Sequence, residues 1–241
     1  MDDNEMVKDN AGGARLLPDS PTIPLTEVAK IPAPGMAFPA DLAFSPDDSL
    51  VAYLYSPERS LARQLFAFDP QSDPQSGQHR LLTAAPGGGT TEENVSLEEA
   101  LRRERMRQLE IGITGYAWSG QLLLIPASGD LYIADQPFGA LRSLLLSQGR
   151  PALDARFSPD GSWVAYVQEG ELFVLPAQGG EPRQLTFGGR EQGKTHGLAE
   201  YIAQEEMDRR SGYWWSPDSR WLAFEEVDET HIPVYRIVHQ G

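Results

Sequence analysis

Short runs in which apolar and polar residues alternate dominate the chain from about residue 40 onwards. In WVAYVQ, for example, every second residue from Trp163 to Val167 falls on one face of a strand. Turn residues separate the runs, and no long stretch repeats with the period of a helix. The pattern therefore predicts many short β-strands joined by tight turns.

Four segments share one order: an aromatic residue, a Ser-Pro-Asp turn or a reduced form of it, and an alternating apolar run. They are LAFSPDDSLVAYLY (42–55), YAWSGQLLLIPA (116–127), ARFSPDGSWVAYVQ (155–168) and WWSPDSRWLAFEE (214–226). Pro and Asp followed by Gly or Ser build a turn between two strands. A second hairpin, with Gln-Gly-Gly at its turn, is expected in ELFVLPAQGGEPRQLT (171–186).

The spacing of these units predicts the architecture. Their serines are Ser45, Ser119, Ser158 and Ser216, which lie 74, 39 and 58 residues apart. A propeller blade takes roughly 40–50 residues, so the spacing of 39 corresponds to one blade. The other two spacings exceed it by 35 and 19 residues, and each excess coincides with helix-favouring sequence. We predict an all-β fold, a β-propeller with about four blades in this chain and two short helical insertions.

The first predicted insertion covers about residues 86–110. It opens with PGGGTTEENV, a flexible connector, and continues as a helix in SLEEALRRERMRQLE. Ser96 and Glu99 form a capping box at the start of this helix. Ion pairs with i,i+4 spacing are expected for Glu98–Arg102 and Glu99–Arg103. Four arginines, at positions 102, 103, 105 and 107, crowd this short helix.

The second insertion, about residues 189–212, predicts a helix from about Leu198 to Arg210. Glu205 and Glu206 lie near its C-terminal end, where the helix dipole disfavours an anion. One interpretation is a solvated acidic pair, with Glu206 paired to Arg210. The other is a binding site, because two carboxylates can accept two of the three N–H donors of a primary ammonium. An arginine of the first insertion could then bind a carbonyl or carboxylate of the same ligand, as in a peptide N-terminus.

Composition narrows the classes of function. The 35 acidic and 20 basic residues give a net charge of −15, which disfavours nucleic acid as a partner. The absence of cysteine excludes disulfides and thiolate metal sites. The N-terminal MDDNEMVKDNAGG is not a secretory signal, and no apolar run approaches the ~20 residues of a membrane helix. We expect a cytoplasmic protein with no membrane partner. The sequence contains no phosphate-binding loop, zinc-protease or calcium-loop motif, so no cofactor or metal is expected.

A family resemblance adds to this reading. HGLAEYIAQEEMDRRSGYWWSPDSRWLAFEEVDETHIPVYRI resembles the double-glutamate segment of the dipeptidyl-peptidase IV family of prolyl-oligopeptidase-type serine peptidases. The arginine helix followed by GITGYAWSGQLLLIPASGDLYIAD resembles the branch with bacterial members and the cytosolic dipeptidyl peptidases 8 and 9. The resemblance spans about residues 40–241. It implies an eight-bladed propeller above an α/β-hydrolase domain, and release of N-terminal X-Pro or X-Ala dipeptides.

The resemblance also implies roles for residues of this chain. Glu205 and Glu206 would bind the α-ammonium group of a peptide substrate, and Arg105, or else Arg103, would bind a backbone carbonyl of the same dipeptide. Residues 1–38 would form an N-terminal extension and residues 39–241 part of the propeller. Further blades, the hydrolase domain and a second copy in a homodimer would be the partners.

The chain departs from the family pattern in its catalytic groups. No G-x-S-x-G motif occurs, and the histidines are expected to be structural or at the surface. They are His79, His196, His231 and His239. The hydrolase domain is thus predicted to be absent from the chain, which would be inactive alone. Because the chain ends inside a blade, we expect the propeller to leave strand edges open. The alternative is a TolB- or WD40-like propeller that binds or scaffolds proteins without peptidase activity.

Overall fold

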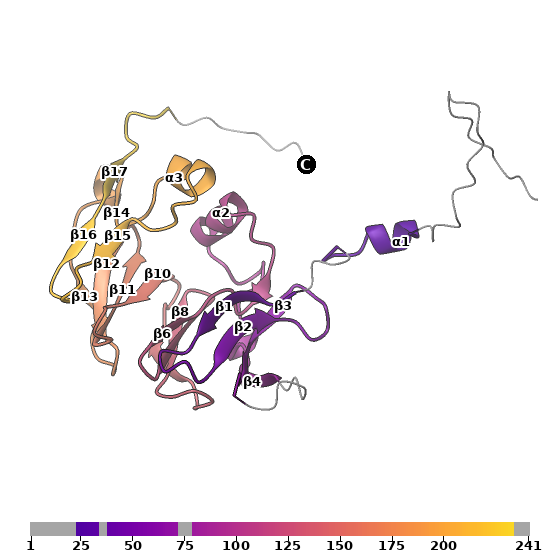
Figure 1. The fold of residues 1–241 in the computed structure, drawn as a ribbon. Helices are drawn as coiled ribbons and strands as arrows, with labels where there is room; N and C mark the ends of the chain where they lie inside the picture. Colours follow the sequence, from indigo (N-terminus) through magenta and orange to yellow (C-terminus); the bar gives the residue numbers. More distant parts are fainter. Residues whose placement is uncertain (1–22, 34–37, 72–78, 234–241) are drawn as a thin grey trace, which may run out of the picture.

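A computed structural model describes residues 23–33, 38–71 and 79–233. Three sheets of four antiparallel strands follow one another in chain order (Figure 1). The first sheet contains β1 (Ala40–Phe44), β2 (Val51–Tyr55), β3 (Ala62–Phe68) and β4 (His79–Thr83). The second contains β6 (Ala117–Ser119), β7 (Leu122–Ala127), β8 (Asp130–Ala134) and β9 (Arg142–Leu145). The third contains β10 (Leu153–Phe157), β11 (Trp163–Gln168), β12 (Glu171–Pro176) and β13 (Arg183–Gln184).

Shorter strands complete the described β structure. β15 (Tyr213–Trp215) and β16 (Leu222–Phe224) form a hairpin, and β14 (Lys194–His196) pairs with β17 (Glu226–Asp228). β5 (Ile111–Gly112) lies parallel to β3 at the edge of the first sheet. The prediction of a mostly β chain is confirmed, and the three four-stranded sheets are consistent with propeller blades. Each of the four repeat units coincides with the first two strands of a sheet or hairpin.

The Ser-Pro-Asp turns are built alike. Ser45 donates from Oγ to Asp47 Oδ1 over 2.6 Å, and its Oγ accepts from the backbone N–H of Leu50 over 2.9 Å. The same two contacts recur at Ser158 with Asp160 and at Ser216 with Asp218. A short side-chain network thus closes each turn between the first and second strands of a unit.

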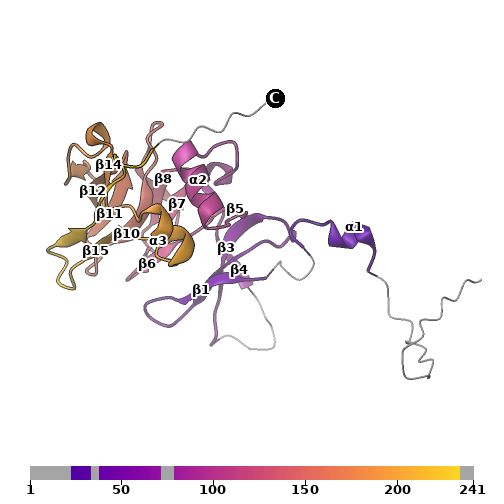
Figure 2. The ribbon, with the colours of Figure 1, turned by 90° about the horizontal axis from the view of Figure 1, so that it is seen from above.

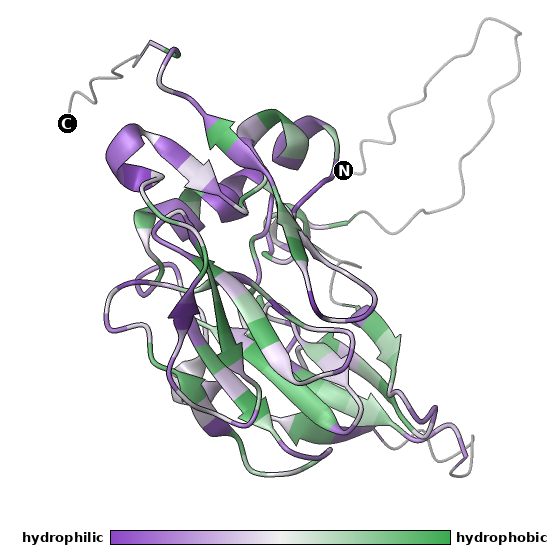
Figure 3. Cartoon of the chain, turned by 90° about the vertical axis from the view of Figure 1, so that its left-hand side faces the viewer, coloured by the Kyte–Doolittle hydropathy of each residue, from purple (hydrophilic) through white to green (hydrophobic). Residues whose placement is uncertain are grey.

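The apolar core lies between successive sheets. The cluster between the first and second sheets includes Leu54, Leu65, Leu123 and Ile125. The next two clusters join the second sheet to the third, and the third sheet to the β15–β16 hairpin. Figure 3 shows the apolar residues concentrated on the strands, whereas the helices above them are largely hydrophilic. Burial of both faces of the middle sheets stabilises the stack of sheets.

Two tyrosines tie neighbouring units together. The hydroxyl of Tyr116 donates to the backbone carbonyls of Asp41 and Ala52, at 2.6 and 2.9 Å. Tyr213 makes the equivalent contacts with the carbonyls of Asp154 and Ala165. Each tyrosine stands at the start of its own unit and bonds to the first two strands of the preceding one.

The helices lie outside the sheets. They are α1 (Leu25–Val28), η1 (Pro86–Gly88), α2 (Leu97–Arg105), η2 (Arg190–Gln192) and α3 (Tyr201–Glu206). α2 falls in the first predicted insertion, and η2, β14 and α3 fall in the second. The predicted helix over residues 198–210 was too long, and the strand β14 in the same insertion was not predicted. Of the expected extension 1–38, residues 1–22 and 34–37 lie outside the described ranges, as does His239.

Candidate functional site

The arginine helix α2 is fixed at both ends. The backbone N–H of Glu99 donates to Ser96 Oγ over 3.1 Å, which confirms Ser96 as the N-cap. The predicted i,i+4 pairs are replaced by one i,i+3 pair, in which Glu99 contacts Arg102 at 3.3 Å. Arg103 is unavailable to Glu99 because it turns into the protein and donates to the carbonyl of Glu110 over 2.6 Å.

The segments that flank α2 hold it against the sheets. The loop before α2, predicted as a flexible connector, forms a bridge in which Thr90 and Gly112 exchange two backbone hydrogen bonds. Gly112 has a φ of +83°, and a Cβ there would lie 2.4 Å from the carbonyl oxygen of Arg63. Glycine is therefore required where β5 meets β3. An ion pair of 2.8 Å between Arg63 and Glu110 adds to this attachment.

The double-glutamate helix α3 is short because residues close to each of its ends stop it from extending further. The Glu200 side chain accepts from the backbone N–H groups of Ile202 and Ala203, both at 2.7 Å, so the helix begins after it. The helix ends at Glu206, and Asp208 has a φ of +48°. Glu205 and Glu206 are thus the last two helical residues, whereas the sequence predicted a helix that continues to about Arg210, and both residues are exposed.

The two insertions meet in space, with α2 and α3 side by side above the sheets (Figures 1 and 2). The Arg105 guanidinium carbon lies 5.2 Å from the centre of the Tyr201 ring, within cation–π range. The side chain of Glu205 acts on the Tyr201 hydroxyl and, together with the Glu205 charge, raises the pKa of Tyr201. The charge of Arg105 opposes that shift, and the charge of Glu206 adds to it.

The four predicted site residues do not share one environment. Arg105 and Glu205 both act on Tyr201, and Glu206 is the exposed residue that follows Glu205. Arg103 is 6% exposed, and its guanidinium faces Glu110 rather than α3. Tyr201 itself is a residue that sequence reasoning missed. Its position one helical turn before Glu205 was the available signal.

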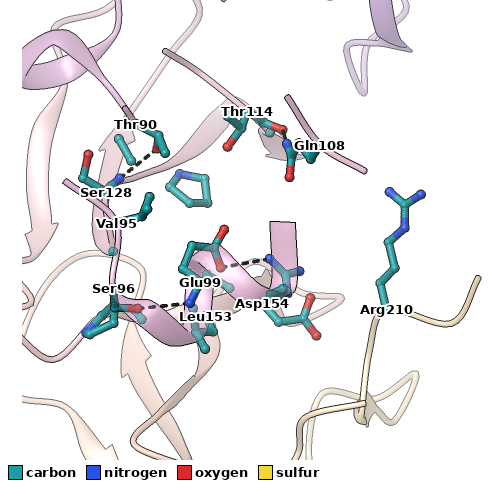
Figure 4. A pocket seen from close by; sticks show the side chains of 18 of the residues that line it. Thr90, Val95, Ser96, Glu99, Gln108, Thr114, Ser128, Leu153, Asp154 and Arg210 are labelled. Atoms are coloured by element: carbon teal, nitrogen blue, oxygen red, sulfur yellow. Dashed lines mark hydrogen bonds and ion pairs between the residues drawn. The ribbon is translucent and has the colours of Figure 1, made fainter. Parts of the chain in front are cut away.

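A cavity of about 400 Å³ lies between α2 and the second and third sheets (Figure 4). Its wall includes Glu99, Arg102, Gln108, Asp154 and Arg210. Burial is the main cause that raises the pKa of Asp154, although Arg156 pairs with it at 2.9 Å and opposes that shift. None of Arg103, Arg105, Glu205 and Glu206 lines this cavity, so it is separate from the group around Tyr201.

A cluster of ionisable side chains surrounds His196 of β14. His196 lies between Glu171 and Glu226, with its Nδ1 2.8 Å from Glu171 Oε2 and its Nε2 3.0 Å from Glu226 Oε2. The prediction that this histidine is structural is consistent with its burial.

In the described ranges, no group of three or more histidine or acidic residues could hold a metal ion. Nor is any helix in those ranges long and apolar enough for a membrane crossing.

The second half of the chain, residues 125–241, matches the family described as the dipeptidyl peptidase IV (DPP IV) N-terminal region. This part of the chain is related to that family. The matched residues include Glu205 and Glu206 but neither Arg103 nor Arg105.

Individual relatives agree with the family match. Human dipeptidyl peptidase 8 is 30% identical over an alignment of 168 residues, and the match covers 59% of this chain and 19% of the relative. Human prolyl endopeptidase FAP is 36% identical over 93 residues, 38% of this chain and 12% of the relative. Dipeptidyl peptidase 4 of Felis catus is 29% identical over 79 residues, 32% of this chain and 10% of the relative. The chain thus spans less than a fifth of the length of these relatives.

Proposed function

We propose that this chain is the substrate-anchoring part of the N-terminal propeller of a DPP IV-like serine peptidase that releases X-Pro or X-Ala dipeptides. Glu205 and Glu206 bind the α-ammonium group of the substrate, and Arg105 binds a backbone carbonyl of the same dipeptide. Arg105 is chosen over Arg103 because Arg103 is buried and already bonded to Glu110. The chemistry of hydrolysis belongs to an α/β-hydrolase domain that would pair with this propeller.

The observation that carries the proposal is the convergence of α2 and α3. The guanidinium of Arg105 and the carboxylate of Glu205, from helices about 100 residues apart in sequence, meet at Tyr201, and Glu206 follows Glu205 at the exposed end of α3. An ammonium group offers three N–H donors and a carbonyl only acceptors, so a peptide N-terminus complements both charges. Charge-assisted bonds of this kind contribute about 1.5–3 kcal/mol each where water is excluded.

The test measures, by calorimetry, the affinity of the 241-residue chain for the peptide Ala-Pro-Gly-Gly. Glu205→Ala and Glu206→Ala should each weaken the affinity by about tenfold or more. N-acetylation of the peptide removes the positive charge of its α-ammonium group and should abolish binding. Glu104→Ala, at an exposed glutamate of α2, is the matched control and should bind as the wild type does.

Two results would refute the proposal. One is equal affinity for the free and the acetylated peptide, which would favour a protein-binding propeller without peptidase activity. The other is wild-type binding by both glutamate variants. In the complete peptidase, the same two substitutions should lower kcat/KM for X-Pro substrates by more than ~100-fold.

A further inference from the structure

The strand β14 leads directly into the double-glutamate helix, and its last residue is held from two sides. The His196 side chain is only 8% exposed and lies between Glu171 of β12 and Glu226 of β17. Three residues, Gly197 to Ala199, separate it from the N-cap of α3 at Glu200. His196 therefore joins the start of α3 to the third sheet.

The geometry fixes the protonation of this histidine. A neutral imidazole has a single N–H donor, whereas both nitrogens of His196 face carboxylate oxygens. Glu171 already accepts from Thr186 Oγ1 and from the backbone N–H of Gly189, both at 2.6 Å, so it serves as an acceptor only. His196 satisfies both carboxylates only as an imidazolium.

The two carboxylates that face the ring favour that form, and the nearby cations are each paired with a carboxylate. Lys194 of β14 contacts Glu226 at 2.7 Å and Asp228 of β17 at 4.0 Å, whereas Arg190 of η2 is directed to Glu169 at 2.8 Å. Burial alone would lower the pKa of His196, but the hydrogen bonds to the two glutamates outweigh it and the pKa is raised. The rings of His196 and Phe224 stand nearly perpendicular to each other, with 5.6 Å between their centroids.

The other end of the α3 segment is held by the neighbouring glutamate. Arg209 contacts Glu225 at 2.8 Å, and its backbone N–H bonds to the carbonyl of Ala203 inside α3. The backbone of Glu225 also bonds to Gly197 and Gly212, each over 2.9 Å. The adjacent residues Glu225 and Glu226 thus anchor the segment that contains α3 at its end and at its beginning.

We propose that His196, as an imidazolium, is the positioning residue of the double-glutamate helix, and that ammonium binding by Glu205 and Glu206 weakens when His196 loses its proton. The second part of this statement rests on the proposed function, whereas the first does not. The sign follows from linkage: a group whose pKa is raised by folding stabilises the folded form below its unfolded value of about 6.5. That contribution is lost as the pH rises through the raised pKa.

The first experiment is amide hydrogen exchange on the 241-residue chain across pH 5.5–8.5, reported as protection factors for residues 198–206. In the wild type, protection should fall at least tenfold toward high pH. In His196→Gln it should be low throughout and vary little with pH. His79→Gln, the same substitution at the exposed first residue of β4, should follow the wild type. Wild-type protection in His196→Gln would overturn the positioning role.

A milder variant covers the case in which His196→Gln does not fold. Glu226→Gln keeps an oxygen acceptor and removes one charge from a half-exposed side chain. It should move the loss of protection to lower pH by about one unit, because an adjacent opposite charge raises a histidine pKa by about that much or more. An unshifted profile would contradict the proposal.

The second experiment is binding of Ala-Pro-Gly-Gly at pH 6.5, where the peptide amine, with a pKa of about 7.7–8.0, is charged throughout. His196→Gln should weaken binding at least fivefold. If its helix protection falls but its affinity is unchanged, the link to ammonium binding is refuted. If the wild type shows the protection profile but binds no peptide, the proposed function fails while the positioning role stands.

Discussion

Arg105 of α2 and Tyr201 of α3 form a cation–π contact, with 5.2 Å between the guanidinium carbon and the ring centre. This contact links the two insertions through residues that are almost 100 positions apart in the sequence. Because Glu205 also acts on the Tyr201 hydroxyl and raises its pKa, the tyrosine side chain connects the cationic and the anionic groups of the proposed site. A change at Tyr201 should therefore affect ligand binding without any direct contact to the ligand.

Replacing Tyr201 separates the contributions of its ring and its hydroxyl. Tyr201→Leu removes both, and calorimetry should show a two- to fivefold loss of affinity for Ala-Pro-Gly-Gly, as expected for a cation–π contact of about 0.5–1 kcal/mol. Tyr201→Phe keeps the ring and should lose less. A double-mutant cycle with Arg105→Ala should show coupling between the two residues. Additive effects would mean that the contact does not position Arg105.

The two candidate arginines of α2 should behave in opposite ways. Arg103→Ala leaves the carbonyl of Glu110 without its buried partner, and we expect a loss of about 1–3 kcal/mol in the free energy of unfolding. Arg105→Ala should lower that energy by no more than the ~1 kcal/mol of its contact with Tyr201 but should weaken peptide binding. Urea unfolding and calorimetry on the same samples measure both. A stable Arg103 variant that no longer binds peptide would reverse the assignment.

The repeat of Ser-Pro-Asp turns made the sheets predictable. The contacts that define the motif are local, since the Ser158 side chain bonds to residues two and five positions further along the chain. A local signal of this kind can be read without the fold. The same holds for the Ser96 cap of α2, whose partner Glu99 lies three residues away.

The contacts between distant segments could not be predicted in this way. The partners of His196 lie 25 and 30 residues away, on strands whose registers the sequence does not specify. β14 was missed because three residues, Lys194–His196, are too few for a pattern with period two. Arg103 and Arg105 are distinguished only by the direction of each side chain from α2, which depends on where Glu110 and Tyr201 lie.

A signal for the tyrosine contacts was present in the sequence, however. Tyr116 and Tyr213 each follow a glycine and stand three residues before the marker serine, in GYAWS and GYWWS. Tyr213→Phe removes hydrogen bonds to two carbonyls of the third sheet, and should lower the free energy of unfolding by about 1–3 kcal/mol. Urea unfolding should show a smaller effect for Tyr132→Phe, whose hydroxyl contacts only Asp130 at 3.2 Å. Equal effects would contradict a special role of Tyr213.

The Ser-Pro-Asp turn should also make stability depend on acid pH. Hydrogen bonds, first from Ser158 and then from Ser162, lower the pKa of Asp160 to about 2. Because its pKa is about 3.9 in the unfolded chain, this carboxyl stabilises the fold above pH 4, and its contribution is lost as the pH falls toward 2. In Ser158→Ala the pKa of Asp160 should return toward its ordinary value. The decline of the urea midpoint between pH 4 and pH 2 should then be shallower than in the wild type. Ser143→Ala, at an exposed serine of β9, should keep the full decline, whereas an unchanged decline in Ser158→Ala would mean that Asp160 does not set this dependence.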